Sequence, residues 1–316
     1  MQISITDSTS ANSLTVSSQY ITVNGNSFGN SISVGSVTVN SSQLTVSPSL
    51  MNSSTISVPG LTVGGVPWTL YKGIVDYQVF TANGTWNNPT ANATLGLNGN
   101  EQVFVMMWGG GGGGTSGGTT NGGSGGGGGA CVIGTFLASQ LSSTVSVTVG
   151  SGGASAASVG TSGAGTSSVF SSLVAYGGGG AYNSSGIGGH GGGGGTFSVG
   201  GTGVSTPASG DGGAPLGGNS TVSNSTYGGI RSAGSTIFGG GGGAGPGNIG
   251  GNTVYGGGGA GNTGAGGGLS VFGGRGGISA STTAANAGTI PGGGSGANGT
   301  SAFAGARGEV RVWVIK

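Results

Sequence analysis

The sequence contains very few charged side chains. Six residues are lysine or arginine and five are aspartate or glutamate, which is 3% of 316 residues, against about 25% in ordinary globular domains. The resulting net charge of +1 provides no electrostatic footprint for nucleic acid or for an anionic membrane. We therefore expect neither as a partner.

Cysteine, histidine and long apolar runs are also scarce. A single cysteine, Cys131, excludes a disulfide framework within one chain, and a single histidine, His190, excludes a paired-histidine metal site. Asp211 is a lone carboxylate among glycines, which makes a poor calcium site. No nucleophile-elbow motif surrounds His190. The sequence therefore predicts no enzyme activity, no cofactor and no metal.

The N-terminus lacks the features of a secretion or membrane segment. Residues 1–10 show neither a basic region nor an apolar core, so no signal peptide is expected. No apolar run approaches the roughly 20 residues that span a bilayer. We expect a protein that is made in a cytoplasm and does not insert into a membrane.

Glycine is the most abundant feature, with 85 residues. Collagen is excluded because the sequence has no strict Gly-X-Y frame and only 8 prolines. Charge-driven disorder is excluded because the chain is nearly neutral and mildly apolar. The glycine tracts therefore need a specific ordered arrangement.

Residues 1–66 repeat a small unit in which serine or threonine separates two apolar residues. Its copies are Leu14-Thr15-Val16, Ile21-Thr22-Val23, Ile32-Ser33-Val34, Val37-Thr38-Val39, Leu44-Thr45-Val46, Ile56-Ser57-Val58 and Leu61-Thr62-Val63. Each unit alternates with period two and predicts a short strand between Gly, Asn and Ser turns.

These short strands carry too little apolar surface for a core within one chain. An intertwined homotrimer buries the apolar stripe of each chain against the others, so we predict a β-structured trimeric shaft over residues 1–66. A monomeric mini-domain and an unstructured tether remain alternatives. Residues 67–76 lack the repeat and are interpreted as a neck.

A different pattern begins at residue 77. Alternating or apolar segments at residues 77–80, 101–108, 141–149 and 308–315 predict strands. We therefore predict that a β-sheet base is formed by about residues 77–108, 131–149 and 305–316. Glycine tracts and their connecting loops fill the rest of 77–316, and little or no α-helix is expected.

A ring side chain tends to stand immediately before each glycine tract. The residues in this position are Trp108, Tyr176, His190, Tyr227, Phe238, Tyr255 and Phe272. Ordering a backbone opposes folding by about 1–2 kcal/mol per residue, and glycine loses the most entropy. Laterally packed polyglycine II helices would pair the backbone groups of the tracts. We predict such helices, with the rings as apolar caps at their ends.

The order of these segments resembles a known family. Phe80-Thr81-Ala82-Asn83-Gly84-Thr85-Trp86, then Val103 to Trp108 and the glycines, resembles the opening of the glycine-rich domain in bacteriophage tail fibres and adhesins. Similar matches are Val145-Ser146-Val147-Thr148-Val149, Ser168 to Gly177 and Gly308-Glu309-Val310-Arg311-Val312-Trp313. The resemblance covers about residues 77–316 and does not reach residues 1–66.

The resemblance implies a virion fibre protein whose glycine-rich domain carries host-recognition loops. The expected partners are a second and third copy of the chain, a tail or capsid protein bound through the N-terminus, and a bacterial surface glycan or outer-membrane protein. The candidate receptor contacts are ring, amide or guanidinium residues expected to lie exposed on loops. They are Tyr182, Asn183, Phe197, Asn224, Tyr227 and Arg231.

Each candidate has a structural alternative, because a ring can simply fill the end of the glycine bundle. That alternative is favoured for Tyr227 and is equally good for Tyr182 and Phe197. Two other functions remain open for the whole chain. One is a structural capsid or tail appendage without a receptor, and the other is an ice-binding protein. A regular Thr-x-Thr ladder would favour ice binding, and the sequence shows none.

Overall fold

The computed structural model divides the chain into two compact units, Met1–Thr69 and Leu70–Lys316. The structure describes residues 3–6, 13–16, 21–24, 62–63 and 66–67 of the first unit. In the second unit it describes 74–89, 97–116, 123–157, 160–184, 187–204, 210–215, 217–220, 233–244, 248–260, 266–278, 286–298 and 300–315.

The described part of the first unit consists of short antiparallel strands. Strands β1 (Ile3–Thr6), β2 (Ser13–Val16) and β3 (Ile21–Asn24) form one sheet in that order, and β4 (Thr62–Val63) pairs with β5 (Val66–Pro67). Two predicted units, at residues 14–16 and 21–23, lie within β2 and β3. The units at 32–34, 37–39, 44–46 and 56–58 lie outside the described residues.

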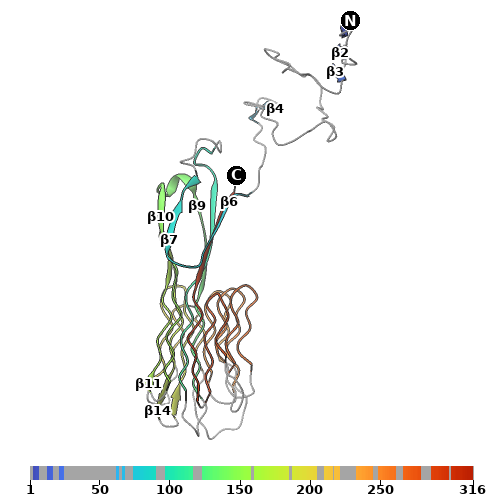
Figure 1. Cartoon of the computed structure of the whole chain (residues 1–316). Helices are drawn as coiled ribbons and strands as arrows, with labels where there is room; N and C mark the ends of the chain where they lie inside the picture. Colours follow the sequence, from blue (N-terminus) through green and yellow to red (C-terminus); the bar gives the residue numbers. More distant parts are fainter. Residues whose placement is uncertain are drawn as a thin grey trace. The chain divides into compact units, whose positions relative to one another are not determined.

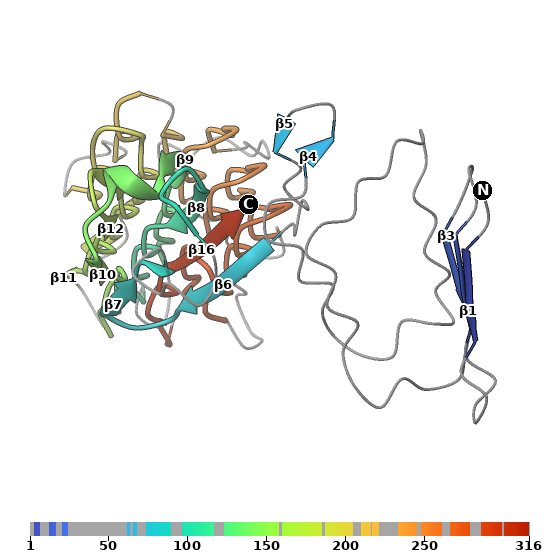
Figure 2. The same ribbon diagram turned by 90° about the horizontal axis from the view of Figure 1, so that it is seen from above.

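The second unit begins with a β-sandwich (Figures 1 and 2). One sheet has the order β6 (Ile74–Phe80), β16 (Glu309–Ile315), β8 (Gln102–Trp108) and β9 (Cys131–Leu137). The other has the order β13 (Leu173–Ala175), β12 (Ser168–Phe170), β10 (Thr144–Thr148) and β7 (Gly84–Asn87). Both sheets are antiparallel throughout.

The predicted strands at 77–80, 101–108, 141–149 and 308–315 are confirmed as parts of β6, β8, β10 and β16. Strands β12 and β13 were missed, because residues 168–175 were assigned to the tracts and loops. The one helical segment that lies wholly within the described residues is a three-residue 3-10 turn, Ala138–Gln140. The described chain is therefore all-β, as predicted, and contains no helix that could cross a membrane.

The hydrophobic core lies between the two sheets. Alternate residues of β8 and β16 point inward and are fully buried, and they meet Trp86, Val147 and Phe170 of the other sheet. Trp86 and Phe170 pack edge to face with ring centroids 5.6 Å apart. The first and last strands of the unit, β6 and β16, pair directly with each other. The sandwich therefore holds the beginning and the end of this unit's chain together.

The glycine-rich segments extend from the sandwich to the opposite end of the unit (Figure 1). A small sheet lies at that far end, with the order β11 (Gly160–Thr161), β14 (Tyr182–Ser184) and β15 (Ile187–Gly189). The tracts thus separate two ends, here called the sandwich end and the far end.

Candidate functional site

The glycine tracts are connected by backbone hydrogen bonds that repeat every third residue. The amides of residues 109, 112 and 115 donate to the carbonyls of residues 130, 127 and 124. The amides of 110 and 113 donate to 166 and 163, and those of 111 and 114 donate to 306 and 303. Each tract residue therefore contacts one of three neighbours in turn, and these tract residues, apart from two isolated bridges at Thr115, belong to no β-ladder.

The close approach of these backbones requires glycine. A Cβ atom built on Gly128 would lie 1.8 Å from the carbonyl oxygen of Gly257, and one on Gly112 would lie 1.9 Å from that of Gly179. Both obstructing atoms belong to backbone that is itself hydrogen-bonded, so no flexible side chain can move aside. The high glycine content is thus a packing requirement of this unit.

The candidate receptor residues do not form one cluster. Tyr182 and Asn183 belong to β14 at the far end, whereas Phe197 lies in the turn that faces the sandwich. Phe197 is 76% exposed and Tyr182 is half-buried. Asn224, Tyr227 and Arg231 lie outside the described residues. Any recognition surface at the far end therefore excludes Phe197.

Asn183 is not an exposed residue, and that prediction is wrong. Its side chain is buried, and its Nδ2 donates to the carbonyl oxygen of Ser116 at 3.1 Å. The amide therefore serves to hold the end of another tract. The sequence predicted an exposed loop at Asn183 but carried no signal of the tract that covers it.

A buried polar cluster surrounds Asn183 at the far end. Asn183 lies opposite Gly188 in the β14–β15 register, and a Cβ on Gly188 would meet Ser124 Oγ at 2.1 Å and His190 Cε1 at 3.4 Å. Thr115 lies opposite Ser124 in an antiparallel bridge, so their side chains share a face. Thr115 Oγ1, Ser124 Oγ, Asn183 Oδ1 and both nitrogens of His190 are buried without a hydrogen-bond partner.

His190 is fully buried in this cluster. Burial away from water lowers the pKa of its imidazole from 6.5 to about 4, so the ring is neutral near pH 7. The sequence predicted a ring cap here, and the ring does precede a tract. It differs from the other described rings of that set because it lies at the far end.

The other described ring caps lie at the sandwich end. Trp108 is fully buried, and its Nε1 donates to the carbonyl oxygen of Tyr255 at 2.6 Å. Phe238, Tyr255 and Phe272 stack face to face, with successive centroids 4.9 Å apart and planes within 5° and 9°. These three rings form a column. The column contacts the edge of the sandwich nearest the tracts, through the hydrogen bond between Trp108 and Tyr255.

The column arises from a repeat of 17 residues that the sequence analysis missed. Ser/Thr, Ile/Val, Phe/Tyr and two glycines recur at residues 236–240, 253–257 and 270–274. Parallel bridges join Thr236 to Thr253 and Thr253 to Ser270. The 17-residue spacing is present in the sequence, but it is difficult to recognise because glycine pairs occur throughout this region. The hydroxyls of Thr236 and Thr253 donate to the carbonyls of Gly239 and Gly256, so they form no free row of the kind that ice binding needs.

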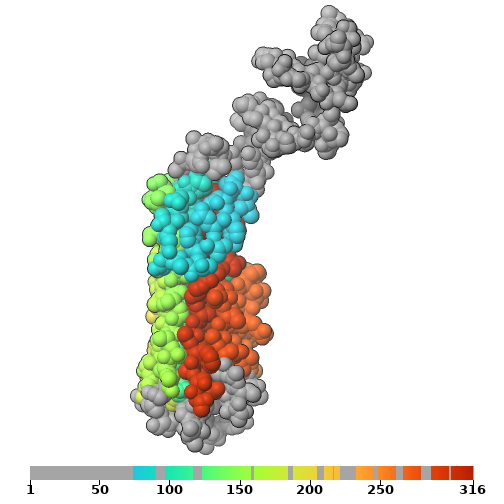
Figure 3. All heavy atoms as spheres, viewed as in Figure 1, coloured from blue at the N-terminus to red at the C-terminus, as the bar shows by residue number. Residues whose placement is uncertain are grey.

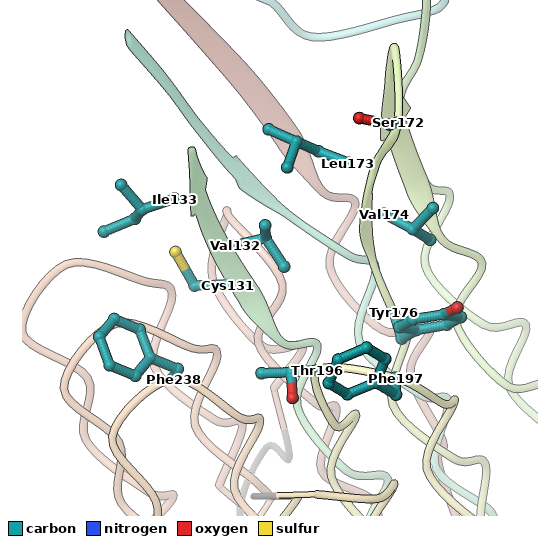
Figure 4. A pocket seen from close by; sticks show the side chains of 10 residues that line it. All are labelled: Cys131, Val132, Ile133, Ser172, Leu173, Val174, Tyr176, Thr196, Phe197 and Phe238. Carbon is teal, nitrogen blue, oxygen red and sulfur yellow. The ribbon is translucent and has the colours of Figure 1, made fainter. Parts of the chain in front are cut away.

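An apolar hollow lies between the edge strands β9 and β13 (Figure 4). Its volume is about 580 Å³, and Tyr176, Phe197 and Phe238 contribute rings to its lining. No charged side chain lines it. Tyr176 was predicted as a cap and is half-buried here. The described residues contain no group of three His, Cys, Asp or Glu that would hold a metal ion.

The chain was compared with curated proteins and with models of protein families. No curated protein matches the chain. The family described as "Glycine-rich domain" matches residues 81–314, a range that contains both sheets of the sandwich except β6 and the last residue of β16, and all the described tracts. The chain therefore belongs to the glycine-rich domain family.

Proposed function

We propose that this protein is a bacteriophage fibre whose glycine-rich unit presents host-recognition loops at the far end. The observation that supports this best is the backbone network. Tracts without side chains are joined every third residue, and they connect the sandwich to the distant sheet β11–β14–β15. A scaffold of this kind holds binding loops in place while leaving their sequence free to vary.

The tracts in this proposal are polyglycine II helices. That conformation has three residues per turn and directs successive backbone groups to three neighbours. The three-residue recurrence of partners at residues 109–116 is what such packing requires. It also supplies partners for backbone groups that are buried away from water.

The first unit forms the trimeric shaft and attaches the fibre to a tail or capsid protein. Its described strands are short and uncharged, and Asp7 is the single charged side chain among residues 1–66. Light scattering of the full chain should give three times the chain mass of 29.2 kDa. A monomer at every concentration would rule out the shaft.

Host recognition by the segment between Ser220 and Ala233 predicts a loss of adsorption when that segment is replaced. Residues 221–232, which include three of the predicted contacts, should be exchanged for Gly/Ser sequence in the full chain. Residues 181–189 should be kept, because Ala181 and Asn183 are buried and a replacement there would disturb the tracts. We expect adsorption of the virion to host cells to fall at least tenfold.

The matched control exchanges Phe197 for serine at the sandwich end, where adsorption should not change. Both variants must retain the melting temperature of the wild type. If the loop exchange leaves adsorption intact, the protein is better explained as a structural appendage without a receptor.

A further inference from the structure

The four-stranded sheet β6–β16–β8–β9 is apolar on both faces. Its inner face forms the core, and its outer face carries a row in which Tyr77, Trp313 and Phe104 lie side by side on β6, β16 and β8. The ring centroid of Trp313 is 5.1 Å from that of Tyr77 and 5.4 Å from that of Phe104. An antiparallel sheet with one solvated face normally alternates apolar and polar residues. Strands that are apolar on both faces indicate a sheet that is covered on both faces.

The neighbouring row of the outer face is similar. Val79, Arg311, Met106 and Ile133 lie in register across the sheet. The charge of Arg311 is already engaged, because its Nη2 lies 2.7 Å from Glu309 Oε1 and its guanidinium stacks over Trp108 at 5.0 Å. No unpaired charge therefore opposes the burial of this row.

The ring column extends the apolar surface below the sheet. Figure 2 shows the turns of the 17-residue repeat, in orange, on the outer side of the sheet, and Figure 3 shows them below the cyan strands. Trp108 links the two regions through its hydrogen bond to Tyr255, and Phe238 lines the same hollow as Ile133. Trp108, at the edge nearest the column, is fully buried, whereas Tyr77 and Val79 in the rows above it are exposed and Trp313 is half-buried.

The exposed apolar area is larger than a monomer usually shows. The large apolar side chains that are at least a third exposed on the outer face and the repeat turns are Ile74, Tyr77, Val79, Ile133, Leu137, Ile237, Phe238, Leu269, Val271 and Phe272. At roughly half exposure each, they present on the order of 900 Å². The largest patch on a typical monomer is about 300–600 Å², and a stable interface buries about 800 Å² on each partner.

We propose that the outer face of this sheet, together with the turns of the 17-residue repeat, is the contact surface for a second copy of this chain. A face without unpaired charge can meet its own copy without like-charge repulsion, whereas a charged partner would lose solvation and gain no counter-ion. The surface area is sufficient for one such contact. The proposal concerns the second unit and does not depend on which host molecule the fibre binds.

The test uses single cysteines in the full-length protein. Val79→Cys places a thiol on the proposed contact surface, at a residue that is 43% exposed in one chain, and Ile133→Cys provides a second position on β9. Val204→Cys is the matched control, at a residue that is 48% exposed on a glycine tract. The native Cys131 is buried, and burial raises the pKa of its thiol, so it should react little with maleimide.

In the purified protein, we expect Val79→Cys and Ile133→Cys to react with maleimide at least ten times more slowly than Val204→Cys. Dilution should raise the two slow rates. A bifunctional maleimide should join two chains through residue 79 or 133 and produce a band at twice the chain mass, but produce none through residue 204.

Equal reaction rates at the three positions would overturn the proposal, because the face would then be free. Slow reaction without any band at twice the chain mass would also overturn it, because the chain itself would then cover the face. If light scattering gives a trimer and the three cysteines react at equal rates, the proposed trimeric shaft is retained and only this contact surface is excluded.

Discussion

Gly128→Ala should lower the free energy of unfolding of the second unit by about 3 kcal/mol or more, because overpacking against a backbone that cannot shift has effects of this size. The added methyl would lie 1.8 Å from the carbonyl oxygen of Gly257. The amide of Gly128 donates to Gly241, and its carbonyl accepts from Gly194, so the residue is held from two further sides. Thermal unfolding of the full chain measures the effect, and we expect a decrease of roughly 10 °C in the Tm of this unit.

Gly266→Ala is the matched control for this substitution. A Cβ on Gly266 would have no atom within 4 Å, and its φ lies outside the left-handed region. Alanine there should leave stability unchanged or raise it by about 0.5 kcal/mol, because it restricts the unfolded chain. If the two variants unfold at the same temperature, the tracts are not packed backbone against backbone, and the scaffold described above is wrong.

Acid should destabilise the second unit through His190. The pKa of this imidazole is about 4 in the folded chain and 6.5 in the unfolded chain, so the unfolded state binds more protons between these values. Stability is therefore fully retained above pH 6.5 and falls as the pH decreases toward 4. The loss should reach about 2.5 kcal/mol at pH 4.5.

His190→Leu removes the proton-binding site and keeps a buried side chain of similar volume. Urea denaturation of both proteins at pH 7.5 and pH 4.5 isolates the contribution of the imidazole from that of the carboxylates. We expect the variant to gain about 2.5 kcal/mol relative to wild type on going to the lower pH. An identical pH dependence in both proteins would show that His190 has access to water or to a partner at the far end.

Several features followed from the sequence because they depend on local chemistry. Period-two alternation identified β6, β8, β10 and β16, because a strand buried on one face requires that pattern. The ring-before-tract rule identified Trp108 and the column of Phe238, Tyr255 and Phe272. The glycine content predicted close backbone packing, because no other residue permits it.

Other features depended on contacts between residues far apart in the chain. Nothing near Asn183 indicates that Ser116 accepts its hydrogen bond, and nothing near Phe197 indicates that its turn faces the sandwich rather than the far end. Glycine tracts look alike in sequence, so the direction of each tract follows only from the partner it meets.

The sequence by itself therefore determined the class of this protein: an all-β, glycine-rich chain with few charged residues and without a disulfide framework. The tertiary structure decided which side chains are available. It buried Asn183 and His190, placed Phe197 at the opposite end from Tyr182 and Asn183, and left the outer face of one sheet apolar and uncovered. The physical reason is that exposure depends on the lateral packing of tracts, and tracts made of glycine carry no side-chain code that specifies their neighbours.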